Sequence, residues 1–314
     1  MRFVKKVCSL LLAAVFVLAL TCGQALASDV VKSIIPLERN GYKLHVASYS
    51  LNDGKAKEPI LLVHGLTYSS HEFDVNYKDY SLARFLAKKG FEVWTFDVTG
   101  YGSSQPVEDG FMPDSNYAAD DIAAVVKAVL AKHNLKNMSV MGWSWGTVTS
   151  GRFAAKYPEL AKKVVLYAPI VAGLGQYDIN KPFNHNTWEH AAGDFQLNKK
   201  GEIDFDITEP SVVDAFQSNS WRYDKESSPN GGRRDLCVDA SKRLIPTASI
   251  KAPVLIIAGT LDPYMTTDLC REAYATLKNK ESKLVLIDGA AHAMMMEKPY
   301  YKAFRNNVLE FLKK

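Results

Sequence analysis

Two hydrophobic patterns alternate along most of the chain. Short continuous apolar runs, each followed by turn residues, occupy positions 60–63, 91–96, 138–141, 164–167, 254–258 and 284–287. Between them, apolar residues recur at helical spacing over 79–89, 115–132, 145–157, 267–278 and 300–312. Continuous apolar runs are typical of parallel strands that are buried on both faces, with helices covering those faces. The pattern therefore predicts an α/β fold with a mostly parallel, doubly wound sheet.

Two segments depart from this alternation. Residues 34–51 show period-two alternation around the Asn40-Gly41 pair, which predicts an antiparallel hairpin. Residues 173–246 contain polar residues, turns and scattered aromatics without a strong strand pattern. Because a structureless loop of that length is improbable inside a compact domain, we expect a mainly helical cap insertion there. The expected core is then divided into residues 28–172 and 247–314.

The first 27 residues have the three parts of a secretory signal peptide. Basic residues precede an apolar run at 7–20, and small residues lead to a cleavage site after Ala27. The run is shorter than the roughly 20 residues of a membrane span. We therefore expect a secreted or periplasmic protein. Lipoprotein anchoring at Cys22 is the alternative. A lipobox would have a small residue, Gly or Ala, just before the cysteine, and Thr21 is a poor match to it.

Charge and cysteine content change this picture little. The 314-residue chain carries a formal net charge of +4, and removal of the leader with its three basic residues leaves +1. A near-neutral chain lacks the electrostatic footprint of a nucleic-acid-binding protein, so no nucleic-acid partner is expected. Cleavage also leaves Cys237 and Cys270, which in an oxidising compartment either form a disulfide or remain buried thiols.

The strongest chemical signal is the sequence Gly-Trp-Ser-Trp-Gly at 142–146, between the apolar run 138–141 and a helical pattern. A G-x-S-x-G motif in this setting forms a sharp strand-to-helix turn that exposes the serine hydroxyl. Ser144 is therefore the predicted nucleophile. The backbone N–H of Trp145 would lie at a helix N-terminus, where a developing oxyanion is stabilised.

A serine hydroxyl needs a base and a group that orients the base. Asp262 follows the run 254–258 and His292 follows the run 284–287, so both are expected at the same sheet edge as Ser144. Asp288 is a rival acid, but it shares a turn with His292 and is interpreted as structural. After the run 60–63, Leu66 is the candidate second oxyanion donor.

Together with the turn at 97–104 and the His-Gly pair at 64–65, these motifs resemble the α/β-hydrolase superfamily from about residue 34 to residue 312. The resemblance implies a mostly parallel eight-stranded sheet with a mainly helical cap. Two departures stand out: Thr99 occupies a position where the resembled motif usually has arginine, and the oxyanion segment lacks the three-glycine form of some lipases. The tryptophans beside Ser144 are similar to those of prolyl aminopeptidase-like members.

The expected function is that of a secreted serine hydrolase that cleaves carboxylic esters through an acyl-enzyme, without a metal or organic cofactor. An aminopeptidase or amidase would use the same triad, and a non-catalytic ligand-binding protein on the same scaffold is a third reading. Serine at the elbow argues against epoxide hydrolases and haloalkane dehalogenases, which need a carboxylate there. Activity should fall below about pH 6.5 as His292 is protonated.

Pocket residues are predicted only from residue type. Trp143, Trp188 and Trp221 are expected to line an apolar substrate pocket. Acidic residues of the insertion are candidates for binding a peptide amine, although a solvated role explains them equally: Glu189, Asp204, Asp206 and Glu209.

Overall fold

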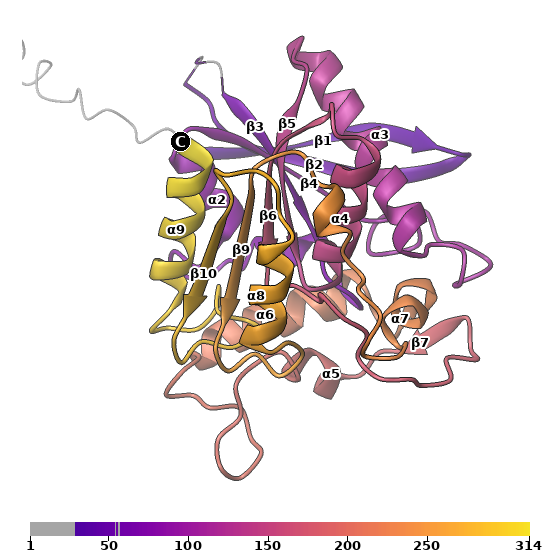
Figure 1. The fold of residues 1–314 in the computed structure, drawn as a ribbon, viewed down its shortest axis with the longest axis vertical. Coiled ribbons are helices and arrows are strands. Elements are labelled where there is room, and N and C mark those ends of the chain that lie inside the picture. Colours follow the sequence, from indigo (N-terminus) through magenta and orange to yellow (C-terminus); the bar gives the residue numbers. More distant parts are fainter. Residues whose placement is uncertain (1–28, 54, 56) are drawn as a thin grey trace, which may run out of the picture.

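The computed structural model describes residues 29–314 except 54 and 56 (Figure 1). The expected signal peptide, including Cys22, lies outside the described residues. Eight strands form one sheet in the order β1-β2-β4-β3-β5-β6-β9-β10. Their bounds are β1 Val30–Arg39, β2 Tyr42–Leu51, β3 Glu58–Val63, β4 Phe91–Phe96, β5 Met138–Trp143, β6 Ala161–Tyr167, β9 Val254–Gly259 and β10 Lys283–Ile287. The prediction of an α/β fold with an eight-stranded sheet is confirmed.

Strand direction determines where the functional residues meet. β1 and β2 form an antiparallel hairpin around Asn40 and Gly41, which both have positive φ, and β2 is antiparallel to β4. The other neighbouring strands of the sheet are parallel. The carboxyl ends of β3, β5, β6, β9 and β10 therefore share one edge of the sheet, and residues that follow these strands are brought together there.

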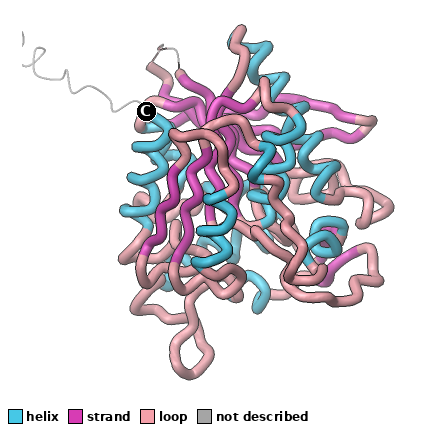
Figure 2. The backbone as a smooth tube through the Cα atoms, viewed as in Figure 1, coloured by secondary structure: helices cyan, strands magenta, loops and turns pink. Residues whose placement is uncertain are grey.

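Helices cover both faces of the sheet (Figure 2). Buried side chains of α3 (Ser115–His133), α4 (Trp145–Lys156) and α8 (Thr267–Ala275) pack on one face. Those of α2 (Leu82–Lys88) and α9 (Tyr301–Lys313) pack on the other. These five helices occupy the segments where helical spacing predicts them. Among the described residues, no helix is both long enough and apolar enough to cross a membrane.

The chain between β6 and β9 forms an insertion that lies beyond the carboxyl ends of the strands (Figure 1). Its elements are β7 Phe183–His185, α5 Trp188–Ala192, α6 Pro210–Tyr223, β8 Ser227–Pro229 and α7 Gly231–Leu236. α6 joins the core, since its Phe216 lies edge-on to Trp143 at 6.4 Å between ring centroids. The insertion is less helical than expected, because β7 pairs with β8 and turns fill much of residues 193–209.

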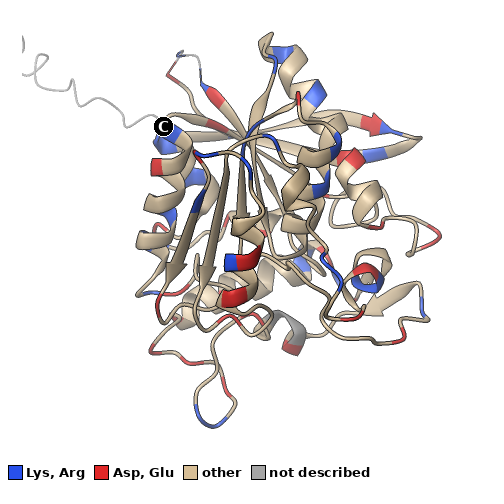
Figure 3. Ribbon diagram, viewed as in Figure 1, with Lys and Arg blue, Asp and Glu red and all other residues tan. Residues whose placement is uncertain are grey.

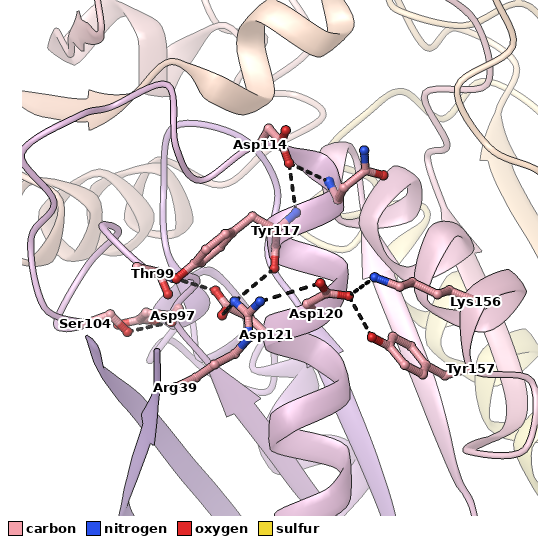
Figure 4. Close-up of polar contacts among 11 residues, drawn as sticks. Arg39, Asp97, Thr99, Ser104, Asp114, Tyr117, Asp120, Asp121, Lys156 and Tyr157 are labelled. Carbon is pink, nitrogen blue, oxygen red and sulfur yellow. Dashed lines mark hydrogen bonds and ion pairs between the residues drawn. The ribbon is translucent and has the colours of Figure 1, made fainter. Parts of the chain in front are cut away.

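The turn after β4 is anchored by an ion-pair cluster (Figure 4). The buried Asp121 carboxylate accepts a hydrogen bond from the N–H of Thr99 at 3.0 Å and pairs with the Arg39 guanidinium at 2.6 Å. Arg39 also lies 3.6 Å from Asp120, which accepts a hydrogen bond from Lys156. The guanidinium therefore comes from β1, whereas the turn itself has threonine in place of the arginine that the resembled motif usually carries.

We expect Arg39→Met to lower the free energy of unfolding by about 2–4 kcal/mol, because the Asp121 charge would remain buried without its partner. Urea unfolding at neutral pH measures the change. Arg243→Met is the matched control, since Arg243 pairs with Glu272 at the surface and both side chains are about half exposed. It should cost less than about 1 kcal/mol. Equal losses in the two variants would contradict the argument.

Candidate active site

Ser144 occupies the turn between β5 and α4 in a strained backbone conformation, with φ +55° and ψ −122°. Its side chain is half-buried, whereas Trp143 and Trp145 on either side are buried. A Cβ atom on Gly142 would lie 2.1 Å from the carbonyl oxygen of Gly146, and one on Gly146 would lie 2.3 Å from that of Val63. Glycine at both positions is therefore required for this tight turn against β3.

His292 and Asp262 form a buried pair at the same edge of the sheet. Nδ1 of His292 lies 2.9 Å from Oδ2 of Asp262, and both side chains are at most 1% exposed. The other carboxylate oxygen accepts a hydrogen bond from the N–H of Tyr264 at 2.9 Å. Asp262 can therefore accept a hydrogen bond from Nδ1–H of His292. In that tautomer Nε2 is the basic nitrogen of the neutral ring.

Backbone contacts connect the histidine loop to the serine turn. The carbonyl oxygen of His292 accepts hydrogen bonds from Nε1 of Trp143 at 3.1 Å and from the hydroxyl of Tyr167 at 2.8 Å. The N–H of Ser144 donates to the carbonyl of Tyr167. The structure thus brings the segments that carry Ser144, Asp262 and His292 to one edge. Asp288, the rival acid, is exposed and accepts a hydrogen bond from Thr260.

The surroundings of His292 act on its pKa in opposite directions. Burial of the imidazole lowers the pKa, but the charge and hydrogen bond of Asp262, with smaller contributions from Asp194 and Glu297, raise it above its ordinary value. The protonated ring is therefore favoured up to a higher pH than in an isolated histidine. The acid limb of a His292-dependent activity is accordingly expected above pH 6.5, not at it.

The loop after β3 is held from two sides. His64 is buried, with Nδ1 2.8 Å from the carbonyl oxygen of Gly65 and Nε2 accepting from the N–H of Val98. The N–H of Gly65 donates to the buried carboxylate of Glu72 at 2.8 Å. Within the described residues, the N–H groups of Leu66 and Trp145 have no hydrogen-bond acceptor. Both are therefore available to a developing oxyanion.

A cavity of about 280 Å³ opens over Ser144. The β3 loop supplies Leu66 and Thr67 to its wall, and the insertion supplies Asp194, Arg233 and Cys237. Two of the three tryptophans predicted for this pocket are elsewhere. Trp188 and Trp221 are both exposed and pack edge-on against each other at 6.1 Å between ring centroids. Residue type alone did not reveal that these rings are not part of the cavity wall.

Trp143 does line the cavity, but its N–H is used to hold the carbonyl of His292. The acidic candidates Glu189, Asp204, Asp206 and Glu209 are not among the lining residues, and Glu209 pairs with Lys78. Two acids that were not predicted do line the cavity: Asp194, whose pKa is raised by burial, and Glu72, which accepts the N–H of Gly65. Sequence reasoning missed Asp194, Arg233, Tyr264, Glu72 and Glu297.

Of the two alternatives for Cys237 and Cys270, the disulfide is not formed, since both are free thiols. Cys270 is buried in α8 within the core cluster, and burial raises the pKa of its thiol to about 12. Cys237 follows α7 in the cavity wall. The two thiols belong to different layers of the fold, which an even cysteine count does not show. Within the described residues, no group of three metal-binding side chains gathers at one place.

Glu297 holds the histidine loop in place, because its carboxylate accepts hydrogen bonds from the N–H of Ala291 and from the side chain of Gln196. Burial raises the pKa of Glu297 to about 7. The folded state then binds more protons than the unfolded state between the ordinary pKa of about 4.5 and pH 7. Glu297 therefore lowers stability as pH rises through this window, by up to about 3 kcal/mol.

Glu297→Gln is expected to remove this dependence. The free energy of unfolding of the variant, minus that of the wild type, should rise by about 3 kcal/mol between pH 4.5 and 7.5. Urea unfolding across that range measures the difference. Glu310→Gln is the control, because the pKa of the exposed Glu310 is lowered by Lys314 and its effect is small with the opposite sign. A pH-independent difference for Glu297→Gln would contradict the interpretation.

Comparisons with known proteins agree with this architecture. The family model described as serine aminopeptidase, S33 matches residues 54–299. "Lipase 3" of Moraxella sp. is 26% identical over 332 residues, covering 95% of this chain and 97% of that protein. A putative non-heme chloroperoxidase of Synechocystis sp. is 31% identical over 116 residues, and the match covers 37% of this chain and 38% of that protein.

Among solved structures, a monoacylglycerol lipase of Paleococcus ferrophilus has a TM-score of 0.63 and 22% sequence identity, covering 86% of this chain and 98% of that one. At this identity the likeness concerns the fold. The family match, by contrast, extends from before β3 to the histidine loop and includes every segment that forms the candidate site. The chain therefore belongs to the serine aminopeptidase S33 family of α/β hydrolases.

Proposed function

We propose that this hydrolase is exported and cleaves carboxylic esters through an acyl-enzyme formed on Ser144. The observation that carries the proposal is the strained, accessible Ser144 at the sheet edge that also holds the buried His292–Asp262 pair. A carboxylate that fixes the imidazole, beside a serine raised on a tight turn, is the arrangement that activates a hydroxyl. The insertion at 173–246 is assigned the role of a cap that closes the cavity.

In the proposed reaction, Nε2 of His292 accepts the hydroxyl proton as the Ser144 oxygen attacks the acyl carbon. Asp262 holds Nδ1–H and stabilises the imidazolium that forms. The N–H groups of Leu66 and Trp145 donate to the tetrahedral oxyanion, and each is worth about a hundredfold or more in rate. His292 then returns the proton to the leaving alcohol. A water molecule, activated by the same imidazole, releases the acid and restores Ser144.

Aminopeptidase activity is the second candidate, because Asp194 lines the cavity. A carboxylate there is a plausible partner for the ammonium group of an aminoacyl substrate. The family description names aminopeptidases, while the relative from Moraxella that matches along nearly its whole length is named a lipase. p-Nitrophenyl esters of increasing acyl length, compared with aminoacyl p-nitroanilides, separate the two. Ester hydrolysis should exceed amide hydrolysis at every chain length.

Active-site labelling tests the proposal directly. A fluorophosphonate should label the purified protein in a one-to-one ratio, and peptide mapping should place the label on Ser144. Absence of labelling together with absence of ester hydrolysis would favour the ligand-binding reading. Export is tested by the N-terminal sequence of protein recovered outside the cytoplasm, which should begin at Ser28. Recovery of a lipid-modified Cys22 would instead support anchoring.

A further inference from the structure

Arg233 is an unusual arginine for this protein. Five arginines in the described part of the chain are half-buried, and four of them pair with an aspartate: Arg39, Arg84, Arg152 and Arg305. Arg233 is the exception. Within the described residues, its hydrogen-bond partners are two neutral oxygens, Oδ1 of Asn230 and Oγ1 of Thr67, each at 2.7 Å. Since a guanidinium has five N–H donors, several remain for a ligand.

The place of Arg233 in the fold is set by close packing of α7 on the serine turn. A Cβ atom on the preceding residue, Gly232, would lie 2.6 Å from the indole ring of Trp145, so glycine is needed for this approach. The side chain of Arg233 then lines the cavity over Ser144 and contacts Thr67, the residue after the candidate oxyanion donor Leu66. Its guanidinium therefore lies in the wall of the cavity in which substrate must bind.

Within the described residues, no acid forms an ion pair with Arg233, and the two acids that line the same cavity, Asp194 and Glu72, have pKa values raised by burial. Burial lowers the pKa of Arg233, and the groups that act in the other direction are Tyr101, Cys237 and Tyr68. Along the ribbon as a whole, by contrast, Lys and Arg positions are interspersed with Asp and Glu positions (Figure 3). A guanidinium that has lost water without gaining a carboxylate is costly to the folded protein. A bound anion would recover that cost.

The cavity wall contains one basic side chain, Arg233, and two acids, Asp194 and Glu72. Asp194 acts on the pKa values of His292 and of Tyr264, whose ring lies edge-on to His292 at 4.6 Å between centroids. Because His292 must protonate the leaving group, the leaving group occupies the part of the wall that contains Asp194. The acyl chain extends away from His292, and Arg233 is the basic side chain that the cavity wall offers to it.

We propose that Arg233 forms an anion subsite for the acyl part of the substrate, so that the preferred substrates are esters whose acyl chain ends in a carboxylate. This inference rests on the proposed ester hydrolysis at Ser144. The chemical class is a monoester of a short dicarboxylic acid. A carboxylate at the far end of such a chain meets the guanidinium in a charge-assisted and bidentate hydrogen bond.

The test compares p-nitrophenyl hydrogen glutarate with p-nitrophenyl pentanoate, which have acyl chains of equal length and differ in the terminal carboxylate. The Ser144→Ala protein serves as the blank for spontaneous hydrolysis. The wild type should show a higher kcat/KM for the glutarate ester. Arg233→Gln, which keeps an N–H donor for Thr67, should lower the ratio of the two kcat/KM values about tenfold or more, as expected for loss of a charge-assisted hydrogen bond.

Arg234→Gln is the matched control, because Arg234 is the next residue of α7, is exposed and stacks on Phe111. Its ratio should equal that of the wild type. A wild-type ratio of one or less would overturn the proposal. So would an equal loss for both esters in Arg233→Gln, since that result is what a purely structural contact with Thr67 produces.

A binding measurement separates failure of the subsite from failure of the proposed function. Monoethyl glutarate should bind to Ser144→Ala protein in calorimetry, at least about tenfold more tightly than to Ser144→Ala/Arg233→Gln. If the wild type hydrolyses neither ester but this difference is observed, ester hydrolysis is wrong and the subsite stands. If pentanoate is hydrolysed and the two proteins bind monoethyl glutarate equally, the hydrolase stands and the subsite is wrong.

Discussion

Ser144→Ala and His292→Ala are each expected to lower kcat for a p-nitrophenyl ester by about 10,000-fold or more, and the double variant should be no slower than either single one. The reason is that the serine oxygen becomes a nucleophile only while the imidazole takes its proton, so removal of either group removes the same step. The residual rate should come from the oxyanion donors and from substrate binding.

Steady-state kinetics at saturating ester measures this non-additivity. His45→Ala is the control, because His45 is half-buried on β2 and lies outside the cavity wall; its kcat should stay within about threefold of the wild type. Urea unfolding of each variant shows that the fold is retained. If the effects of Ser144→Ala and His292→Ala multiplied in the double variant, the two side chains would act independently and the proposed mechanism would be wrong.

The core of the fold was predictable because its signals are local and repeated. Each buried parallel strand is a short apolar run, and each covering helix repeats its apolar residues with helical spacing. Parallel strands all end at the same edge of the sheet, so the residues that follow them are expected to lie close together. Asp262 and His292 were assigned by this rule from a single sequence, even though 118 residues separate Asp262 from Ser144.

The residues that line the cavity or hold the loops beside it could not be found in this way. Asp194 lies in an irregular segment and Arg233 in a six-residue helix, so neither belongs to a periodic pattern that indicates direction. Glu72 and Glu297 are fully buried acids, and only the folded chain shows which N–H groups they accept. A sequence gives the type of each side chain but does not show which neighbour forms a hydrogen bond or an ion pair with it.

The tryptophans illustrate the same limit from the other side. Trp143 sits next to the nucleophile in the sequence, and the serine turn places it in the cavity wall. Trp188 and Trp221 come from two helices of the insertion. Their rings pack against each other at the surface and so need no contact with the cavity. Aromatic residue type therefore predicts a substrate contact only where the sequence also predicts the orientation of the surrounding element, as it does at the serine turn.

Asp262→Asn is expected to lower kcat about 10,000-fold while leaving the fold intact. The asparagine oxygen can still accept the N–H of Tyr264, but then its NH₂ group faces Nδ1 of His292. Nδ1 must accept that hydrogen bond, so the ring proton moves to Nε2, the nitrogen that should take the proton of Ser144. The base is thereby held in the wrong tautomer, although every heavy atom stays in place.

The same substitution should also move the acid limb of the remaining activity. The charge and hydrogen bond of Asp262 raise the pKa of His292, so their removal lets burial lower it, and the limb shifts to lower pH. A kcat–pH profile of each protein measures the shift. Asp288→Asn, which changes the exposed acid in the turn before His292, should leave both rate and profile within about threefold of the wild type. If Asp288→Asn were instead the inactive variant, the acid that orients His292 would be the wrong one, and the geometry at Asp262 would be structural only.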